Sequence, residues 1–101
     1  MQNYLIETYV AGWKHHRDSV KKLKKNDPNR VEALSEPDNP VDPNAISLWF
    51  KGEKIGYIPS AIVTDYRNRP GAEYIVDWTS AGLSLNIYPN GVAAVVEDDG
   101  R

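Results

Sequence analysis

The sequence predicts a mostly β fold, namely a small curled antiparallel sheet or open barrel with two short helices. Short stretches rich in β-branched and aromatic residues recur along the chain, several of them with alternating polarity. Turn-forming Gly, Pro, Asn and Asp residues separate these stretches at short intervals. No strand–helix–strand unit of ordinary length recurs, which argues against a parallel α/β arrangement.

The N-terminal half is expected to contain two strands and one helix. Residues 3–11 mix β-branched, aromatic and polar side chains and predict the first strand, which Gly12 ends. Asp18 or Ser19 can cap a short helix that runs to about residue 25. One apolar stripe of that helix is formed by His16, Val20 and Leu23. Turn formers then precede a second strand over residues 30–34.

The C-terminal half begins with the clearest pattern, a β-hairpin over residues 45–58 with a Gly-containing turn. Pro59 suits the first turn of a short amphipathic helix over residues 60–68. Strands are expected at residues 73–80 and 83–88. Residues 91–96 predict a last short strand or a partly ordered tail. Packing in the core or against a subunit is expected for Trp13, Trp49 and Trp78, and in the core for Phe50.

Composition and length limit the class of protein. The 101 residues fit a single domain over residues 1–101, with a mobile acidic tail at residues 97–101. Apolar residues make up 41% and charged residues 26%, as in folded soluble proteins. We expect a cytoplasmic location, because neither a membrane-spanning stretch nor a secretory signal is visible. The absence of cysteine excludes disulfides, thiol nucleophiles and thiolate zinc sites.

Charge is unevenly distributed along the chain. The net charge is -2, but seven of the twelve Lys and Arg residues fall between residues 14 and 30. Lys21 and Lys24 belong to this group and would face either water or a polyanion. We therefore expect one basic face on a mildly acidic protein.

The stretch EPDNPVDPNAI, residues 36–46, contains three prolines, two Asp and two Asn. The prolines fix their own φ angles and push the preceding residues toward extended conformations, which makes the loop stiff. The Asp and Asn side chains can brace the loop by bonding to nearby backbone amides. Alternatively, the stiff loop can hold a carboxylate and an amide outward for a ligand. The local chemistry leaves both readings open.

The run LSEPDNPVDPNAISLWFKGEKIGYIP, together with the upstream VAGWKHHR, resembles the HIRAN domain family. The segment that carries the resemblance most specifically is Asn39-Pro40-x-Asp42-x-Asn44-Ala45, followed by a strand, a turn and Gly-Tyr-Ile-Pro. The resemblance extends over about residues 4–66. It implies a modified OB-like (or SH3-like) barrel that binds single-stranded DNA and captures a free 3′-hydroxyl end, in DNA repair, recombination or replication-fork processing.

The resemblance also implies roles for particular residues. Asp42 would accept a hydrogen bond from the terminal 3′-hydroxyl, and Asn39 and Asn44 would complete the pocket. Lys14 matches a basic phosphate contact and His15 an aromatic residue that stacks on a base. Nucleic-acid-binding positions are also expected at Val41, Tyr57, Lys21 and Lys24. Val41 stands where the family often has a stacking Tyr and cannot stack itself. Tyr57 could face the same groove or the core.

Other functions have less support in the sequence. His15 and His16 lack metal-ligand spacing, and no motif supports a hydrolytic site, so we expect neither a metal, nor a cofactor, nor an enzyme. One alternative is a protein-interaction or self-association module, which includes a homo-oligomer. The other is an accessory subunit of a separately encoded helicase or nuclease, because the chain has no Walker-type loop.

Overall fold

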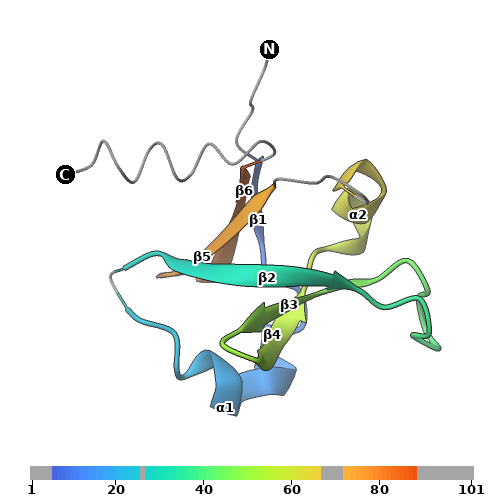
Figure 1. Cartoon of the computed structure of the whole chain (residues 1–101). Coiled ribbons are helices and arrows are strands. Elements are labelled where there is room, and N and C mark those ends of the chain that lie inside the picture. The colour runs from blue at the N-terminus through green and yellow to red at the C-terminus, as the bar shows by residue number, and fades with distance from the viewer. Residues whose placement is uncertain (1–5, 26, 67–71, 89–101) are drawn as a thin grey trace.

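A computed structural model describes residues 6–25, 27–66 and 72–88, and within helix α2 the side chains only as far as Val63. Six strands and three short helical segments account for most of this part of the chain (Figure 1). The strands are β1 (Ile6–Tyr9), β2 (Asn29–Ser35), β3 (Ile46–Phe50), β4 (Glu53–Tyr57), β5 (Glu73–Thr79) and β6 (Gly82–Tyr88). The helical segments are the 3-10 helix η1 (Trp13–His16), α1 (Arg17–Val20) and α2 (Ser60–Tyr66).

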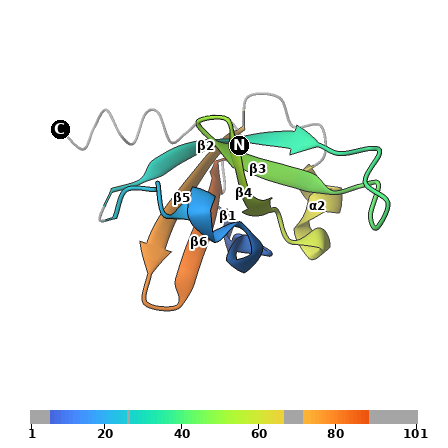
Figure 2. The same cartoon turned by 90° about the horizontal axis from the view of Figure 1, so that it is seen from below.

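The strands form one antiparallel sheet that curls on itself in the order β1-β6-β5-β2-β3-β4 (Figures 1 and 2). The chain beyond β1 then meets the opposite edge strand. Ala11 N donates to Tyr57 O at 2.8 Å, and Tyr57 N donates to Ala11 O at 2.9 Å. This bridge closes the curl, so the prediction of a mostly β, OB-like barrel is confirmed.

The core fills the inside of the curl. Leu48, Ile55, Leu85 and Ile87 are fully buried, and β6 alternates buried with half-buried residues along its length. This alternation is the signature of a strand with one face toward the core. The strands expected at residues 30–34, 73–80 and 83–88 and the 45–58 hairpin are therefore confirmed in type and position. Only Ile6–Tyr9 of the expected strand 3–11 is strand among the described residues.

The helix expected from Asp18 or Ser19 to residue 25 was wrong in both its bounds and its cap. Helical structure begins at Trp13 as a 3-10 turn, and α1 ends at Val20. Ser19 lies inside α1, where its hydroxyl donates to Glu53 Oε1 at 3.0 Å. A helix of one turn is held by tertiary contact rather than by propensity. Of the expected stripe, Val20 and Leu23 are buried.

Three further expectations have different outcomes. Phe50 belongs to the core, and Trp13 and Trp78 pack against it as a T-shaped pair whose ring centroids lie 5.2 Å apart. Trp49, by contrast, is half-buried on the outer face of β3.

The strand expected at 91–96 and the tail 97–101 lie outside the described residues. No helix in the described part of the chain is long and apolar enough to span a membrane.

Candidate nucleic-acid interface

The loop at residues 36–45, hereafter the 36–45 loop, is braced from inside by Asn39. Its side-chain Oδ1 accepts hydrogen bonds from the backbone N–H groups of Val41 at 2.8 Å and Asp42 at 3.0 Å. The loop ends are also joined, since Glu36 N donates to Ala45 O at 2.9 Å. Three prolines and these bonds fix the backbone, which is the bracing role that the sequence left open.

Asp42 is the loop carboxylate best placed for a ligand. Its Oδ1 accepts a hydrogen bond from Asn44 N at 2.9 Å, which fixes the orientation of the carboxylate. Within the described ranges, no donor hydrogen-bonds to the other oxygen, Oδ2. The residue is half-buried, although a lone carboxylate is usually solvated or paired. One bonding position of Asp42 is thus available at a fixed place.

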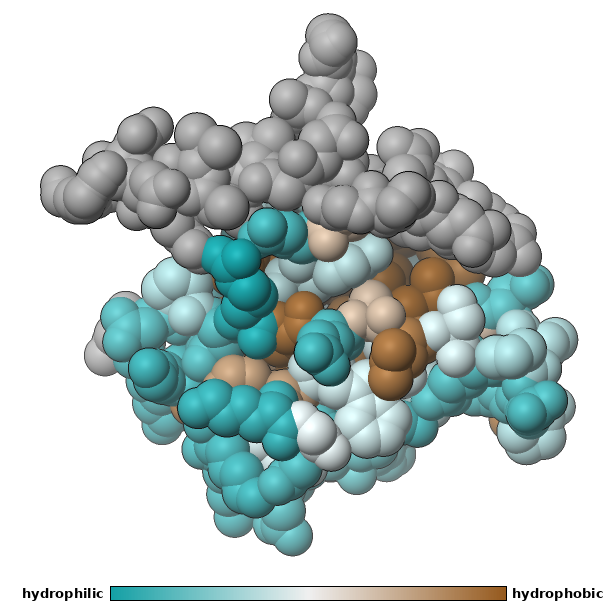
Figure 3. Space-filling model, viewed as in Figure 1, coloured by the Kyte–Doolittle hydropathy of each residue, from teal (hydrophilic) through white to brown (hydrophobic). Residues whose placement is uncertain are grey.

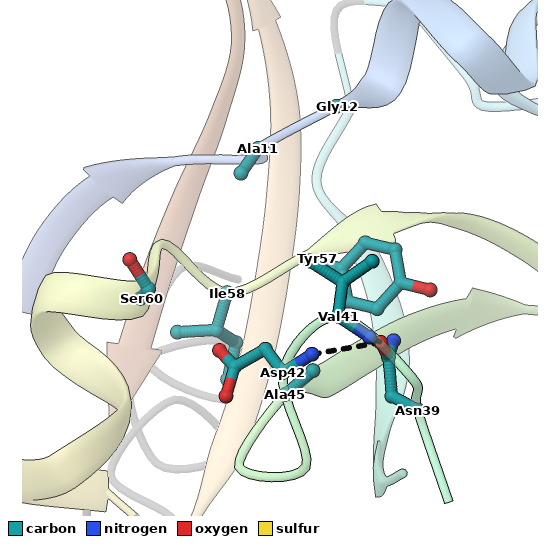
Figure 4. Close-up of a pocket in the computed structure, with 9 residues that line it drawn as sticks. All are labelled: Ala11, Gly12, Asn39, Val41, Asp42, Ala45, Tyr57, Ile58 and Ser60. Carbon is teal, nitrogen blue, oxygen red and sulfur yellow. Dashed lines mark hydrogen bonds between the residues drawn. The ribbon is translucent and has the colours of Figure 1, made fainter.

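A groove of about 410 Å³ lies beside Asp42 and is called the loop groove here. Figure 4 shows its walls, which come from the 36–45 loop, the end of β4, the start of α2 and the segment after β1. The lining residues are Ala11, Gly12, Asn39, Val41, Asp42, Ala45, Tyr57, Ile58 and Ser60. The Asp42 carboxylate lies on the Ile58 side of this groove. Among the described lining residues, Asp42 is thus the only acidic acceptor, and it lies beside an apolar floor.

Tyr57 enters the groove wall because β4 contains a bulge. Leu48 pairs with Gly56 and Trp49 pairs with Lys54, which leaves Ile55 as an extra residue between the two pairs. On a regular strand, residues three apart point to opposite faces. The bulge brings Lys54 and Tyr57 to the same face, where Lys54 Nζ donates to the Tyr57 hydroxyl at 3.0 Å.

The chain matches the family described as the HIRAN domain over residues 3–68. It belongs to the HIRAN domain family. The crystal structure of the HIRAN domain of human HLTF has a similar fold, with a TM-score of 0.56 and 18% sequence identity. The match covers 96% of this chain and 89% of that one. No curated protein matches the sequence.

In this HIRAN domain, the groove brings together Asn39, Val41, Asp42 and Tyr57. Of these, Val41 stands at the rim with 90% of its surface exposed. Asn44 is exposed and does not line the groove; its backbone N–H instead orients Asp42. Asn39 uses its side-chain oxygen within the loop, so the structure gives it an ordering role besides its place in the wall.

The predicted basic and aromatic contacts lie beside the groove. The segment η1–α1 runs along β4, from the bridge at Tyr57 to Ser19, which contacts Glu53 at the other end of β4. Lys14 and His15 follow the groove residue Gly12 and are exposed. The remaining two lie farther along: Lys21 is 4.0 Å from Asp18, and Lys24 is exposed in the turn after α1. Their roles stay predictions.

Two residues that the sequence did not single out contact the groove residues directly. Glu36 Oε1 accepts hydrogen bonds from Asn39 Nδ2 and from the Tyr57 hydroxyl, both at 3.0 Å. Lys54 Nζ lies 2.7 Å from Glu36 Oε2. The acidic-Pro start of the motif was a signal for Glu36, whereas the contact of Lys54 depends on the bulge.

The same hydrogen bonds shift the pKa values of Glu36 and Lys54. The hydrogen bond from Lys54 is the largest cause that lowers the pKa of Glu36 to about 2; burial opposes it, and bonds from Asn39, Ser47 and Tyr57 add to it. The bond to Glu36 raises the pKa of Lys54. Both residues are therefore charged near neutral pH. Among the described residues, no group of three or more His, Asp or Glu could hold a metal ion.

Proposed function

We propose that this chain is a non-catalytic module that binds single-stranded DNA and recognises a free 3′-hydroxyl end through Asp42. In HLTF-like proteins the HIRAN domain is a nucleic-acid-binding module. Such a module would act on DNA ends in repair, recombination or replication-fork processing, in the cytoplasm, alone or beside a separate helicase or nuclease. The placement of Asp42 in the loop groove supports the end-recognition part most directly.

Asp42 suits a hydroxyl and disfavours a phosphate for two reasons. A carboxylate oxygen accepts hydrogen bonds but donates none, and Oδ2 lacks a donor within the described ranges. A 3′-phosphate removes the hydroxyl donor and adds negative charge. At a separation of about 4 Å, two unit charges repel by about 1 kcal/mol in water and about 4 kcal/mol near a protein surface. We expect at least about tenfold preference for the hydroxyl, which corresponds to about 1.4 kcal/mol.

The rest of the groove suits the sugar and base of an end nucleotide. Ala45 and Ile58 are buried and give the floor its apolar character. Tyr57 is half-buried in the wall, and aromatic stacking contributes about 1–3 kcal/mol per base. The groove should accept any base, because every base has a π-face and stacking needs no base-specific hydrogen bonds.

Fluorescence anisotropy with matched oligonucleotides tests the proposal. One oligonucleotide ends in a 3′-hydroxyl and the other in a 3′-phosphate, and each is titrated at two salt concentrations. The wild type should bind the hydroxyl end more tightly at both. Equal affinities would rule out end recognition, and no binding at low salt would rule out the nucleic-acid function.

The Asp42→Ala variant should lose the preference for the hydroxyl end, and Asp38→Ala is its matched control. Asp38 is an exposed carboxylate of the same loop that does not line the loop groove. Both variants remove one negative charge, so a general charge effect should appear equally in both. A preference that survives Asp42→Ala would contradict the assigned role.

Self-association is a second candidate function, which one surface feature favours. Leu34 lies on the outer face of β2 with 50% of its surface exposed. Two residues earlier in the same strand, Glu32 pairs with Trp49 of β3. Figure 3 shows apolar side chains near the middle of the view, with hydrophilic ones beside and below them. A dimer in sedimentation equilibrium that Leu34→Glu dissociates would support this function. A monomer at all concentrations would exclude it.

A further inference from the structure

We propose that Glu36 and Lys54 are positioning residues, which hold Asn39 and Tyr57 in the geometry of the loop groove without touching the bound strand. The inference rests on the proposed function, because the two residues would maintain the geometry of that same binding site. It also concerns the free protein, in which the geometry of the loop can be measured without DNA.

The Glu36 carboxylate joins two elements that are distant in sequence. Its Oε1 receives one hydrogen bond from the loop, from Asn39 Nδ2, and one from β4, from the Tyr57 hydroxyl. Asn39 in turn holds the N–H groups of Val41 and Asp42. One carboxylate therefore fixes the distance between the loop that carries Asp42 and the strand that carries Tyr57.

Lys54 completes the arrangement from the side of the hairpin. Its Nζ pairs with Glu36 Oε2 at 2.7 Å and donates to the Tyr57 hydroxyl at 3.0 Å. The ammonium also lies 5.0 Å from the Tyr57 ring centroid and 5.5 Å from that of Trp49, within cation–π range. Tyr57 is thus held at its hydroxyl and at its ring, while the residue still lines the groove.

These contacts favour positioning over direct binding. The side chains of Lys54 and Glu36 are only 26% and 21% exposed, and each uses its charged group on the other. A phosphate could bind Lys54 only by competing with Glu36. A preorganised loop and ring, by contrast, reduce the ordering entropy that binding would otherwise cost.

Glu36→Gln tests the inference, with Glu53→Gln as its matched control. Glu53 lies in the hairpin of β3 and β4 and, like Glu36, pairs with a lysine, here Lys22, but it contacts α1 rather than the groove. The measured quantity is the dissociation constant for the 3′-phosphate oligonucleotide divided by that for the 3′-hydroxyl oligonucleotide. We expect Glu36→Gln to reduce this ratio by about tenfold or to bring it to about one. Glu53→Gln should leave the ratio at its wild-type value. An unchanged ratio in folded Glu36→Gln would overturn the inference.

Lys54→Met separates positioning from phosphate binding. Positioning predicts a reduced ratio with an unchanged salt dependence of binding. A direct phosphate contact instead predicts equal weakening for both oligonucleotides and a slope of log K against log salt that is smaller by about 0.7. The second result would overturn the inference. This variant also keeps the test decisive if Glu36→Gln does not fold.

Nuclear magnetic resonance of the free protein provides a readout that does not depend on DNA. The amide signals of Val41 and Asp42 report the bonds to Asn39. Both should shift in Glu36→Gln and stay in place in Glu53→Gln. If the wild type fails to distinguish the two ends, the proposed function fails, and the amide shifts still decide whether Glu36 orders the loop. Unshifted amides would overturn the inference.

Discussion

At the scale of single residues, the side chain of Val41 makes few contacts although it lines the loop groove. Val41 lines the rim, yet 90% of its surface is exposed and its branched side chain cannot stack on a base. The backbone N–H of Val41 is already held by Asn39. A larger side chain at this position can therefore extend over the groove without disturbing the loop.

Val41→Tyr should tighten binding of single-stranded DNA. A stacking ring adds about 1–3 kcal/mol per base, which corresponds to about fivefold or more in affinity. Anisotropy titrations of the wild type and the variant measure the change. Val41→Leu is the control, since it adds bulk without a ring. A gain as large for Leu as for Tyr would contradict stacking as the cause.

Glu36 should make the stability of the protein sensitive to acid. Its folded pKa is lowered to about 2 from the ordinary 4.5. Its contribution is therefore fully present above the unfolded pKa and is lost as the pH falls through the folded value. Urea unfolding at pH 7 and pH 3 should show that the wild type loses more stability than Glu36→Gln. Equal losses of unfolding free energy in the two proteins would show that the ionised Glu36 carboxylate does not stabilise the fold.

At the scale of secondary-structure elements, β4 controls both the closure of the barrel and the site. Its bulge at Ile55 sets Lys54 and Tyr57 on one face, and its end pairs with Ala11. Gly56 lies between these two features with φ 154°, a value that residues with side chains rarely adopt. The bulge therefore depends on a residue without a side chain.

Gly56→Ala should destabilise the protein strongly. A Cβ there would lie 2.5 Å from Val10 Cγ1 and 2.7 Å from Ala11 O, so the barrel closure would have to shift. We expect a loss of about 3 kcal/mol or more, from overpacking and backbone strain together. Gly52→Ala is the control, because Gly52 has φ 85° but open space around it. Urea unfolding should give the control a loss of about 1 kcal/mol. Similar losses would contradict crowding at Gly56.

At the scale of the whole molecule, the position of η1–α1 along β4 orders the basic residues by their distance from the groove. Lys14 lies two residues after Gly12, which lines the groove. Beyond α1, the backbone N–H of Lys24 donates to Asn29 Oδ1, which holds that turn at the start of β2. β4 alone extends roughly 13 Å between its end residues. If a strand end binds in the groove as proposed, we expect it to meet Lys14 before Lys24.

Lys14→Ala should weaken the binding of every oligonucleotide and reduce the salt slope by about 0.7. Lys24→Ala should matter only for oligonucleotides long enough to reach beyond α1. A length series measured at several salt concentrations distinguishes the two variants. Equal effects of Lys14→Ala and Lys24→Ala on the shortest oligonucleotide that binds would contradict this order.

The sequence determined the strands, the hairpin and the stiff loop, because each depends on local periodicity or local backbone chemistry. Alternating side chains predicted β3 and β6, and the prolines predicted a stiff loop, which Asn39 does brace. The helix after Gly12 was misplaced for the opposite reason. One turn of helix has little stability of its own, so its bounds follow contacts such as that of Ser19 with Glu53.

Only the tertiary structure decided which side chains meet. The bridge of Ala11 with Tyr57 joins residues that are far apart in sequence, as do the contacts of the Glu36 carboxylate with Tyr57 and Lys54. The bulge at Ile55 reverses the side to which Lys54 points relative to Tyr57. A local pattern cannot contain this information, because a single extra residue in a strand changes every facing relation beyond it.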